Sequence, residues 1–198
     1  MKKWDFNNMK LYDKIKNYIP FNDQEAQDKE KILKFIEANP DFLLRDNLTG
    51  HMTTSIWTVN KDRTKTLMVY HNIYDSWSWI GGHADGEELL HQVAMRELRE
   101  ETGITNASLI NDEIFSIEIL DVAEHVKKGK TVPKHFHFNV TYIAEADEEC
   151  ALHINEEENK DVRWFTFDEA LKASKEPWMV ENVYRKLIER TNNETHNR

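Results

Sequence analysis

Apolar side chains recur at every third or fourth position in two segments near the N-terminus, which is the spacing of one helix face. The first segment, residues 8–19, ends before Pro20, and the second, residues 23–38, ends before the turn sequence NPD. The pattern therefore predicts two helices, which form an N-terminal helical extension over residues 1–45.

From His51 onward the pattern changes to short runs that alternate or are rich in β-branched and aromatic residues. These runs are TTSIWTV, TLMVY, WSWI, IFSIEILDV, HFHFNVTY and VRWFTF, and Asn, Asp and Gly turns join them. Helical spacing returns near residues 168–172 and over residues 177–191, where Met179, Val180, Val183, Leu187 and Ile188 are expected to point inward. We expect an α/β domain over residues 46–191, followed by a C-terminal tail, residues 192–198.

One further helix lies between the strand runs, in GGHADGEELLHQVAMRELREETGI, Gly81 to Ile104. Asp85 is expected to cap its start, with Glu88 completing a capping box, and Gly103 fits the left-handed position that ends a helix. At about 100° per residue one stripe carries apolar residues first and carboxylates one or two turns later. The stripe contains Leu90, Val93, Ala94, Glu97, Glu100 and Glu101.

The three carboxylates at the end of this stripe repel one another, and the negative end of the helix dipole adds to the repulsion. Arg96 projects from a neighbouring face and offsets the charge only in part. A hard divalent cation such as Mg²⁺ or Mn²⁺ suits a group of carboxylate, carbonyl and water ligands. The alternative is a solvated acidic helix end. The pair Gly81 and Gly82 favours the metal, because glycine lets the backbone approach a ligand closely.

Composition restricts the function classes. The chain has 26 Lys and Arg against 36 Asp and Glu, a formal net charge of −10, which argues against a nonspecific grip on nucleic acid or on an anionic membrane. Its one cysteine, Cys150, excludes an internal disulfide framework and a cysteine zinc cluster. The N-terminal residues contain no continuous apolar run, so we expect neither a signal peptide nor a membrane span, but a cytoplasmic protein.

The helix and the glycines before it closely resemble the Nudix box, G-x5-E-x7-R-E-U-x-E-E-x-G-U, where U is a bulky aliphatic residue. Every defined position is filled, by Gly82, Glu88, Arg96, Glu97, Leu98, Glu100, Glu101, Gly103 and Ile104. Many Nudix proteins have proline before the glycine pair, where this chain has Ile80. The resemblance implies an α/β/α sandwich around a mixed β-sheet. It also implies Mg²⁺-dependent hydrolysis of a small molecule, a nucleoside diphosphate linked to another moiety.

The same resemblance implies roles for individual residues. Glu97, Glu100 and Glu101 correspond to metal-binding carboxylates, and the backbone carbonyl of Gly82 to a further ligand. Glu88 and Arg96 correspond to structural residues that hold the loop and helix in register.

One of the three box carboxylates, or a downstream glutamate, acts as general base in such enzymes. The downstream residue lies about six positions before a tryptophan, which selects Glu158 ahead of Trp164, with Glu156 and Glu157 as neighbours. The alternative for this acidic run is a solvated loop.

Substrate contacts must come from outside the box. In KHFHFNVTY, His135 and His137 lie on the polar face of an alternating strand, which either contacts a phosphate or base or faces solvent. His51 has the same two interpretations, and Trp79 either stacks on a ligand ring or belongs to the core. The segment IEILDV lacks the proline or tyrosine that accompanies ADP-ribose or dinucleoside polyphosphate activity, so no particular substrate is indicated.

Two other functions share this fold. An isopentenyl diphosphate isomerase needs a catalytic cysteine in a strand, whereas Cys150 lies in an acidic loop. A noncatalytic ligand sensor of the kind found in Nudix-related transcription regulators would have a decayed box and a basic DNA-binding domain. The intact box and the acidic composition of this chain argue against that function. For the helical extension we expect one of two roles: it covers the domain or it forms a homodimer contact.

Overall fold

The computed structural model describes residues 9–127 and 130–196, and the chain divides into two compact units. The first unit comprises residues up to Ser55 together with Gly82–Val93 and Glu113–Thr141. The second comprises Ile56–Gly81, Ala94–Asp112 and the residues from Tyr142 onward. Strands β1 (Gly50–Val59) and β9 (His135–Glu145) each begin in the first unit and end in the second.

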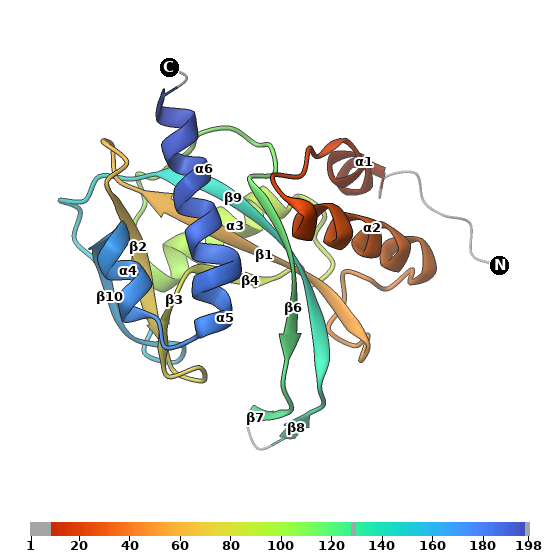
Figure 1. Cartoon of the computed structure of the whole chain (residues 1–198). Helices are drawn as coiled ribbons and strands as arrows, with labels where there is room; N and C mark the ends of the chain where they lie inside the picture. Colours follow the sequence, from red (N-terminus) through yellow and green to blue (C-terminus); the bar gives the residue numbers. More distant parts are fainter. Residues whose placement is uncertain (1–8, 128–129, 197–198) are drawn as a thin grey trace. The chain divides into compact units, whose positions relative to one another are not determined.

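Two helices open the first unit, as the apolar spacing predicts. They are α1 (Met9–Asn17) and α2 (Asp23–Ala38), which lie near each other in Figure 1. The side chain of Asn22 caps α2 by accepting a hydrogen bond of 2.9 Å from the Glu25 amide. The α2 stripe of Ile32 and Ile36 is fully buried. The predicted boundary near residue 45 between an extension and a domain stays a prediction.

The first unit also contains a long antiparallel pair. Strand β6 (Ser116–Val122) pairs with β9 from Ser116↔Thr141 to Val122↔His135. Beyond this pair, β7 (His125–Lys127) and β8 (Lys130–Val132) form a short hairpin at the far end of the two strands (Figure 1).

The second unit is built on antiparallel strands and the remaining helices. Strand β2 (Lys65–His71) pairs with β10 (Asn159–Thr166) on one side and β3 (Ser76–Ser78) on the other, and β5 (Ser108–Leu109) pairs with the end of β9. Helices α4 (Phe167–Ala173), α5 (Pro177–Met179) and α6 (Arg185–His196) and the π-helix η2 (Val180–Tyr184) also belong to the second unit. Strand β4 (Ile80–His83) begins in the second unit and ends in the first, and helix α3 (Leu90–Thr102) begins in the first unit and ends in the second.

The sheet is mixed. Its strand order is β10-β2-β1-β9-β5, with β3 on β2, β4 on β1 and β6 on β9. The Phe136 amide bonds to Thr49 O and the Ala146 amide to Val59 O, so β1 and β9 advance together and are parallel. The expected α/β architecture around a mixed sheet is confirmed.

The C-terminal helix shows how one irregular turn shifts a buried face. Met179, Val183 and Leu187 are buried as predicted, whereas Val180 and Ile188 are only half-buried. The π-helical turn η2 inserts an extra residue per turn and brings Tyr184 fully into the core. Its ring stacks with that of Trp57 at a centroid distance of 6.1 Å.

The predicted start of the box helix is wrong, and its predicted end is confirmed. Helix α3 begins at Leu90, because Asp85 lies in a turn with a φ of 47° and its carboxylate pairs with Arg45. Asp85 therefore lies in the turn before the helix and is not its N-cap residue. At the other end Gly103 adopts a φ of 74° and its amide donates to Arg99 O at 2.9 Å.

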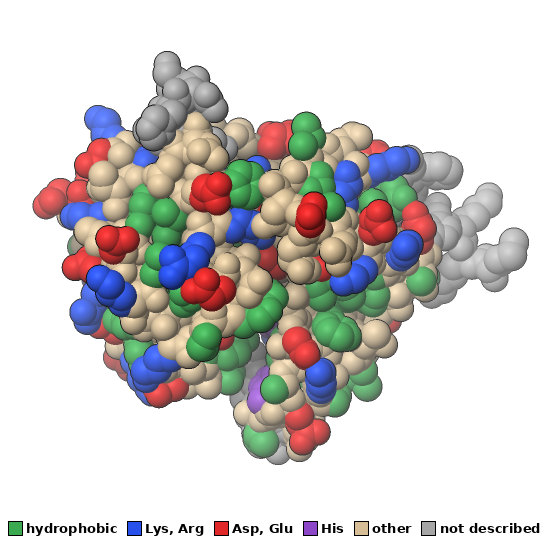
Figure 2. Space-filling view, in the orientation of Figure 1, with side chains coloured by type: hydrophobic (Ala, Val, Ile, Leu, Met, Phe, Trp, Pro, Cys, Tyr) green, Lys and Arg blue, Asp and Glu red, His purple; other side chains and the backbone are tan. Residues whose placement is uncertain are grey.

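Among the described residues, no helix has both the length and the apolar character needed to cross a membrane. Acidic and basic side chains are interspersed on the face shown in Figure 2.

The start of β1 requires glycine because other chain segments approach it closely. A Cβ at Gly50 would lie 2.6 Å from Phe136 O and 2.7 Å from Phe138 Cε2. We predict that Gly50→Ala lowers the free energy of unfolding by about 1–3 kcal/mol, since β9 must shift to relieve the overlap. Urea unfolding measures the change, with Thr49→Ala at the exposed neighbour as the control. An unchanged midpoint for Gly50→Ala would show that β9 is not fixed against β1.

Candidate active site

Three carboxylates converge in the second unit. Glu97 and Glu101 lie on α3, and Glu158 lies immediately before β10. One carboxylate oxygen from each residue lies within 4.8 Å of the others, so the three side chains form one group of oxygen ligands.

Glu101 is the buried member of this group. Only 3% of its surface is exposed. Asn159 Nδ2 donates to its Oε2 at 2.9 Å, and the Gly81 amide is placed to donate to its Oε1 at 3.3 Å. Burial raises the pKa of Glu101 to about 8, and the negative charges of Glu97 and Glu158 add to the rise, while the two hydrogen bonds oppose it. The protein's own groups therefore compensate only part of the charge that Glu101 carries when it is ionised.

Glu100, the third predicted carboxylate of the helix, is not part of the converging group. Its side chain is 57% exposed, and its Oε1 lies 3.9 Å from Arg96 Nε. It stands about 100° around the helix from Glu101, at the edge of the stripe, and so faces solvent. A metal-binding role for Glu100 stays a prediction.

Glu158 is exposed, but its backbone is held in place. Its amide donates to Asn155 O at 2.9 Å, and its carbonyl accepts from the Asn72 amide at 2.9 Å. Neighbouring Glu156 and Glu157 are also exposed and do not belong to the converging group. The structure therefore distinguishes one glutamate in a run of three.

Sequence reasoning missed Asn159. Its side chain is 1% exposed and holds the buried carboxylate of Glu101. It stands where β10 begins to pair with β2, at Asn159↔His71. Nothing in the acidic run EEENKD marks this asparagine as different from its solvated neighbours; only its place at the start of a strand could have drawn attention to it.

Three further residues of the box are half-buried, and Trp79 packs in the core. Gly82 lies half-buried in β4, and Glu88 and Arg96 are half-buried before and within α3. Trp79 is 9% exposed, and its ring meets Tyr184 edge-on at a centroid distance of 6.0 Å. This packing belongs to the core. The predicted roles of these residues stay predictions.

Histidines predicted to contact substrate gather separately, in the first unit. His51 on β1, His83 on β4 and His137 on β9 have ring centroids 4.9–5.1 Å apart, and His135 lies 4.9 Å from His137. His83 was missed, because a single histidine after a glycine pair carries no pattern of its own.

The alternative of a solvated polar face on β9 is wrong. His135, Asn139 and Thr141 are all buried, and His137 is half-buried. Burial lowers the pKa of His51, although the Asn47 backbone opposes the change. Burial and the neighbouring imidazoles lower the pKa of His137 to about 2. Both rings are therefore neutral near pH 7.

Known proteins with similar folds were found by comparing structures. The chain is similar to a C. elegans Ap4A hydrolase in a binary complex (18% identity, 74% of this chain and 98% of that chain, TM-score 0.53). It is also similar to the E. coli dihydroneopterin triphosphate pyrophosphohydrolase (17% identity, 69% of this chain and 94% of that chain, TM-score 0.53). A third similar structure is the MutT protein from Methanosarcina mazei (16% identity, 74% of this chain and 95% of that chain, TM-score 0.51). At these identities the likeness shows the fold alone.

A comparison with curated protein sequences gave no match. The family model of the NUDIX domain matches residues 49–189, which include all three members of the carboxylate group, Glu97, Glu101 and Glu158. The filled box, the mixed sheet and this match lead to one conclusion: the chain belongs to the Nudix family.

Proposed function

We propose that this Nudix protein is a Mg²⁺- or Mn²⁺-dependent pyrophosphohydrolase that cleaves the diphosphate bond of a nucleoside diphosphate linked to another moiety. The main support for this proposal is that the buried carboxylate of Glu101 lies close to the carboxylates of Glu97 and Glu158.

The carboxylate group fits a hard divalent cation. All its ligand atoms are oxygens, which Mg²⁺ and Mn²⁺ prefer. Because burial raises the pKa of Glu101 to about 8, the ionised group needs a positive partner that the protein itself does not supply in full. Glu97, Glu101 and Glu158 would hold the ion, with Glu100 and the Gly82 carbonyl as further ligands that the family pattern suggests.

The bound ion would neutralise the diphosphate oxygens and lower the pKa of the attacking water. Asn159 and the Gly81 amide restrict Glu101 to one orientation, so that its carboxylate is positioned before substrate arrives. Glu158 is the member of the group with the most access to solvent and is suited to accept a proton from water at a carboxylate oxygen. The water oxygen would then bond to one phosphorus while the bond from that phosphorus to the bridging oxygen breaks, and the other phosphate would leave with the bridging oxygen.

The substrate class defines the first experiment. Two similar structures are named for hydrolysis of Ap4A and of dihydroneopterin triphosphate, so both compounds belong in a panel with nucleoside diphosphate derivatives. Release of phosphate or nucleotide should require the divalent ion. Equal turnover with and without Mg²⁺ after chelator treatment would contradict the proposal.

A variant series tests the assignment of individual carboxylates. Glu101→Gln should abolish most turnover, and Glu158→Gln should lower kcat by about 100-fold or more with little change in KM, as expected for loss of a general base. Glu156→Gln is the matched control, since it removes an exposed charge from the same run and should leave kcat nearly unchanged. Small and equal effects of Glu158→Gln and Glu156→Gln would assign the base to Glu97 or Glu100.

The raised pKa of Glu101 also predicts a pH dependence of stability in the metal-free protein. The folded state keeps a proton on Glu101 up to about pH 8, whereas the unfolded chain releases it near pH 4.5. Stability should therefore be fully present below about pH 4.5 and fall as the pH rises toward 8, by at most about 1.4 kcal/mol per pH unit from this group.

Urea unfolding at pH 5 to 8 measures this effect. Glu101→Gln should remove most of the decline, whereas Glu100→Gln, at an exposed side chain, should keep it. Added Mg²⁺ should stabilise the wild type more strongly at pH 8 than at pH 5, because the ion competes with the proton. The same decline in Glu101→Gln as in the wild type would show that other groups cause it.

A further inference from the structure

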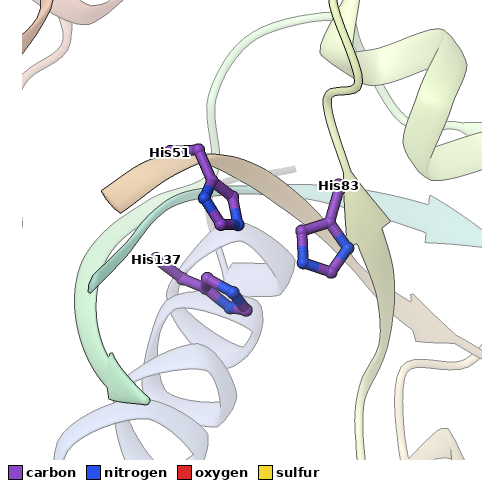
Figure 3. Close-up of side chains that lie close together, drawn as sticks. All are labelled: His51, His83 and His137. Carbon is purple, nitrogen blue, oxygen red and sulfur yellow. The ribbon is translucent and has the colours of Figure 1, made fainter. Parts of the chain in front are cut away.

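The histidine cluster, defined as His51, His83 and His137, brings together rings from three strands of the first unit. Figure 3 shows the three side chains extending from β1, β4 and β9 toward one another. One ring nitrogen of each lies within 4.8 Å of the others. In a tetrahedral zinc site, ligand nitrogens stand about 3.3 Å apart, so small side-chain rotations would close the group around an ion.

His51 is the most buried member of the cluster. The residue is 4% exposed, and neither of its ring nitrogens has a hydrogen-bond partner of ordinary geometry. Leaving a buried polar group unsatisfied costs free energy, and such groups are rare in folded proteins. The ring is aimed at the other two histidines, so a ligand at their centre would satisfy it.

The chemistry of the three rings selects the kind of ligand. Three imidazoles packed this closely repel one another if they are protonated, so they are poor partners for an anion such as phosphate. Neutral imidazoles instead offer nitrogen lone pairs, which suit Zn²⁺ and similar transition-metal ions better than Mg²⁺.

His135 provides the outer contact that metal-binding histidines usually have. Its Nδ1 lies 2.8 Å from Pro133 O, and because a carbonyl only accepts, this nitrogen carries the proton. In the tautomer with the proton on Nδ1 alone, its Nε2 accepts from His137 Nε2, 3.1 Å away. This leaves the lone pair of His137 on Nδ1, where a metal ion can use it.

We propose that His51, His83 and His137 form a binding site for a divalent transition-metal ion of the Zn²⁺ type, with His135 as a positioning residue. The site differs in chemistry from the carboxylate group, which offers only oxygen ligands. An ion there links β1, β4 and β9 and stabilises the first unit. Through His83 it also restrains the chain next to Gly82, the first residue of the box.

The test measures Zn²⁺ binding to chelator-treated protein by equilibrium dialysis with metal analysis, in an excess of Mg²⁺ that occupies the carboxylate group. The wild type should retain one Zn²⁺ per chain. His51→Asn and His137→Asn should each weaken binding by more than about 100-fold, because loss of a ligand costs more than loss of a ligand's hydrogen-bond partner.

Matched controls distinguish the histidine cluster from exposed histidines and from the carboxylate group. His153→Asn removes one exposed histidine of the second unit and should bind Zn²⁺ like the wild type. Glu97→Gln should also bind it, because the carboxylate group is not involved. Circular dichroism establishes that each variant is folded. Histidine ¹⁵N resonances of the wild type provide a second measurement, which should shift for three rings when Zn²⁺ is added.

Three results would overturn the proposal: no Zn²⁺ retained by the wild type, unchanged binding in both cluster variants, or loss of Zn²⁺ in Glu97→Gln. If the cluster contacts substrate instead, the cluster variants would raise KM while Zn²⁺ has no effect on the ¹⁵N resonances of the wild type.

Discussion

The carboxylate of Glu101 is buried at the end of a helix, where desolvation, two other carboxylates and the helix dipole all act against its charge. Segments far apart in the sequence hold it there, because the Gly81 amide and the Asn159 side chain both direct hydrogen bonds to its oxygens. The metal-free protein therefore keeps this carboxyl protonated up to about pH 8. The arrangement is explained if a divalent cation supplies the missing positive charge during function.

The same constraint organises the neighbouring elements. Helix α3 presents Glu97 and Glu101 on the face that is apolar one turn earlier, and it ends at Thr102, because Gly103 adopts a positive φ there. Strand β10 must begin at Asn159, so Glu158 lies next to the anchoring asparagine. The exposed glutamate and the buried carboxylate are thus coupled through one hydrogen bond at the start of a strand.

Periodic features were predictable from the sequence, and features that depend on distant partners were not. The 3.6-residue period identified α2 with both its ends, and it placed Glu97 and Glu101 on the inward stripe of α3. It could not show that Asp85 would lie in a turn and pair with Arg45, since 40 residues separate the two. Nor could it show that Glu100 faces solvent, because that depends on where the stripe ends.

The local sequence pattern also could not show whether the polar face of β9 is buried. The alternation of polar and apolar residues correctly placed Asn139 and Phe138 on opposite faces of the strand, but a polar face can lie in solvent or in a buried network. Here Asn139 donates to Glu118 at 3.1 Å, and Ser116 links Glu118 to Glu25 of α2 through a hydrogen bond of 2.9 Å to the latter. This network fixes the strand that carries His137, and so orders the histidine cluster from one side.

A divalent cation should be what allows Glu101 to ionise at neutral pH. Nuclear magnetic resonance titration of the Glu101 side-chain carboxyl carbon, with and without Mg²⁺, tests it directly. The pKa of Glu101 should be about 8 in the metal-free protein and well below neutrality once Mg²⁺ is bound. An ordinary carboxyl pKa without Mg²⁺, or a raised pKa that Mg²⁺ does not change, would contradict it.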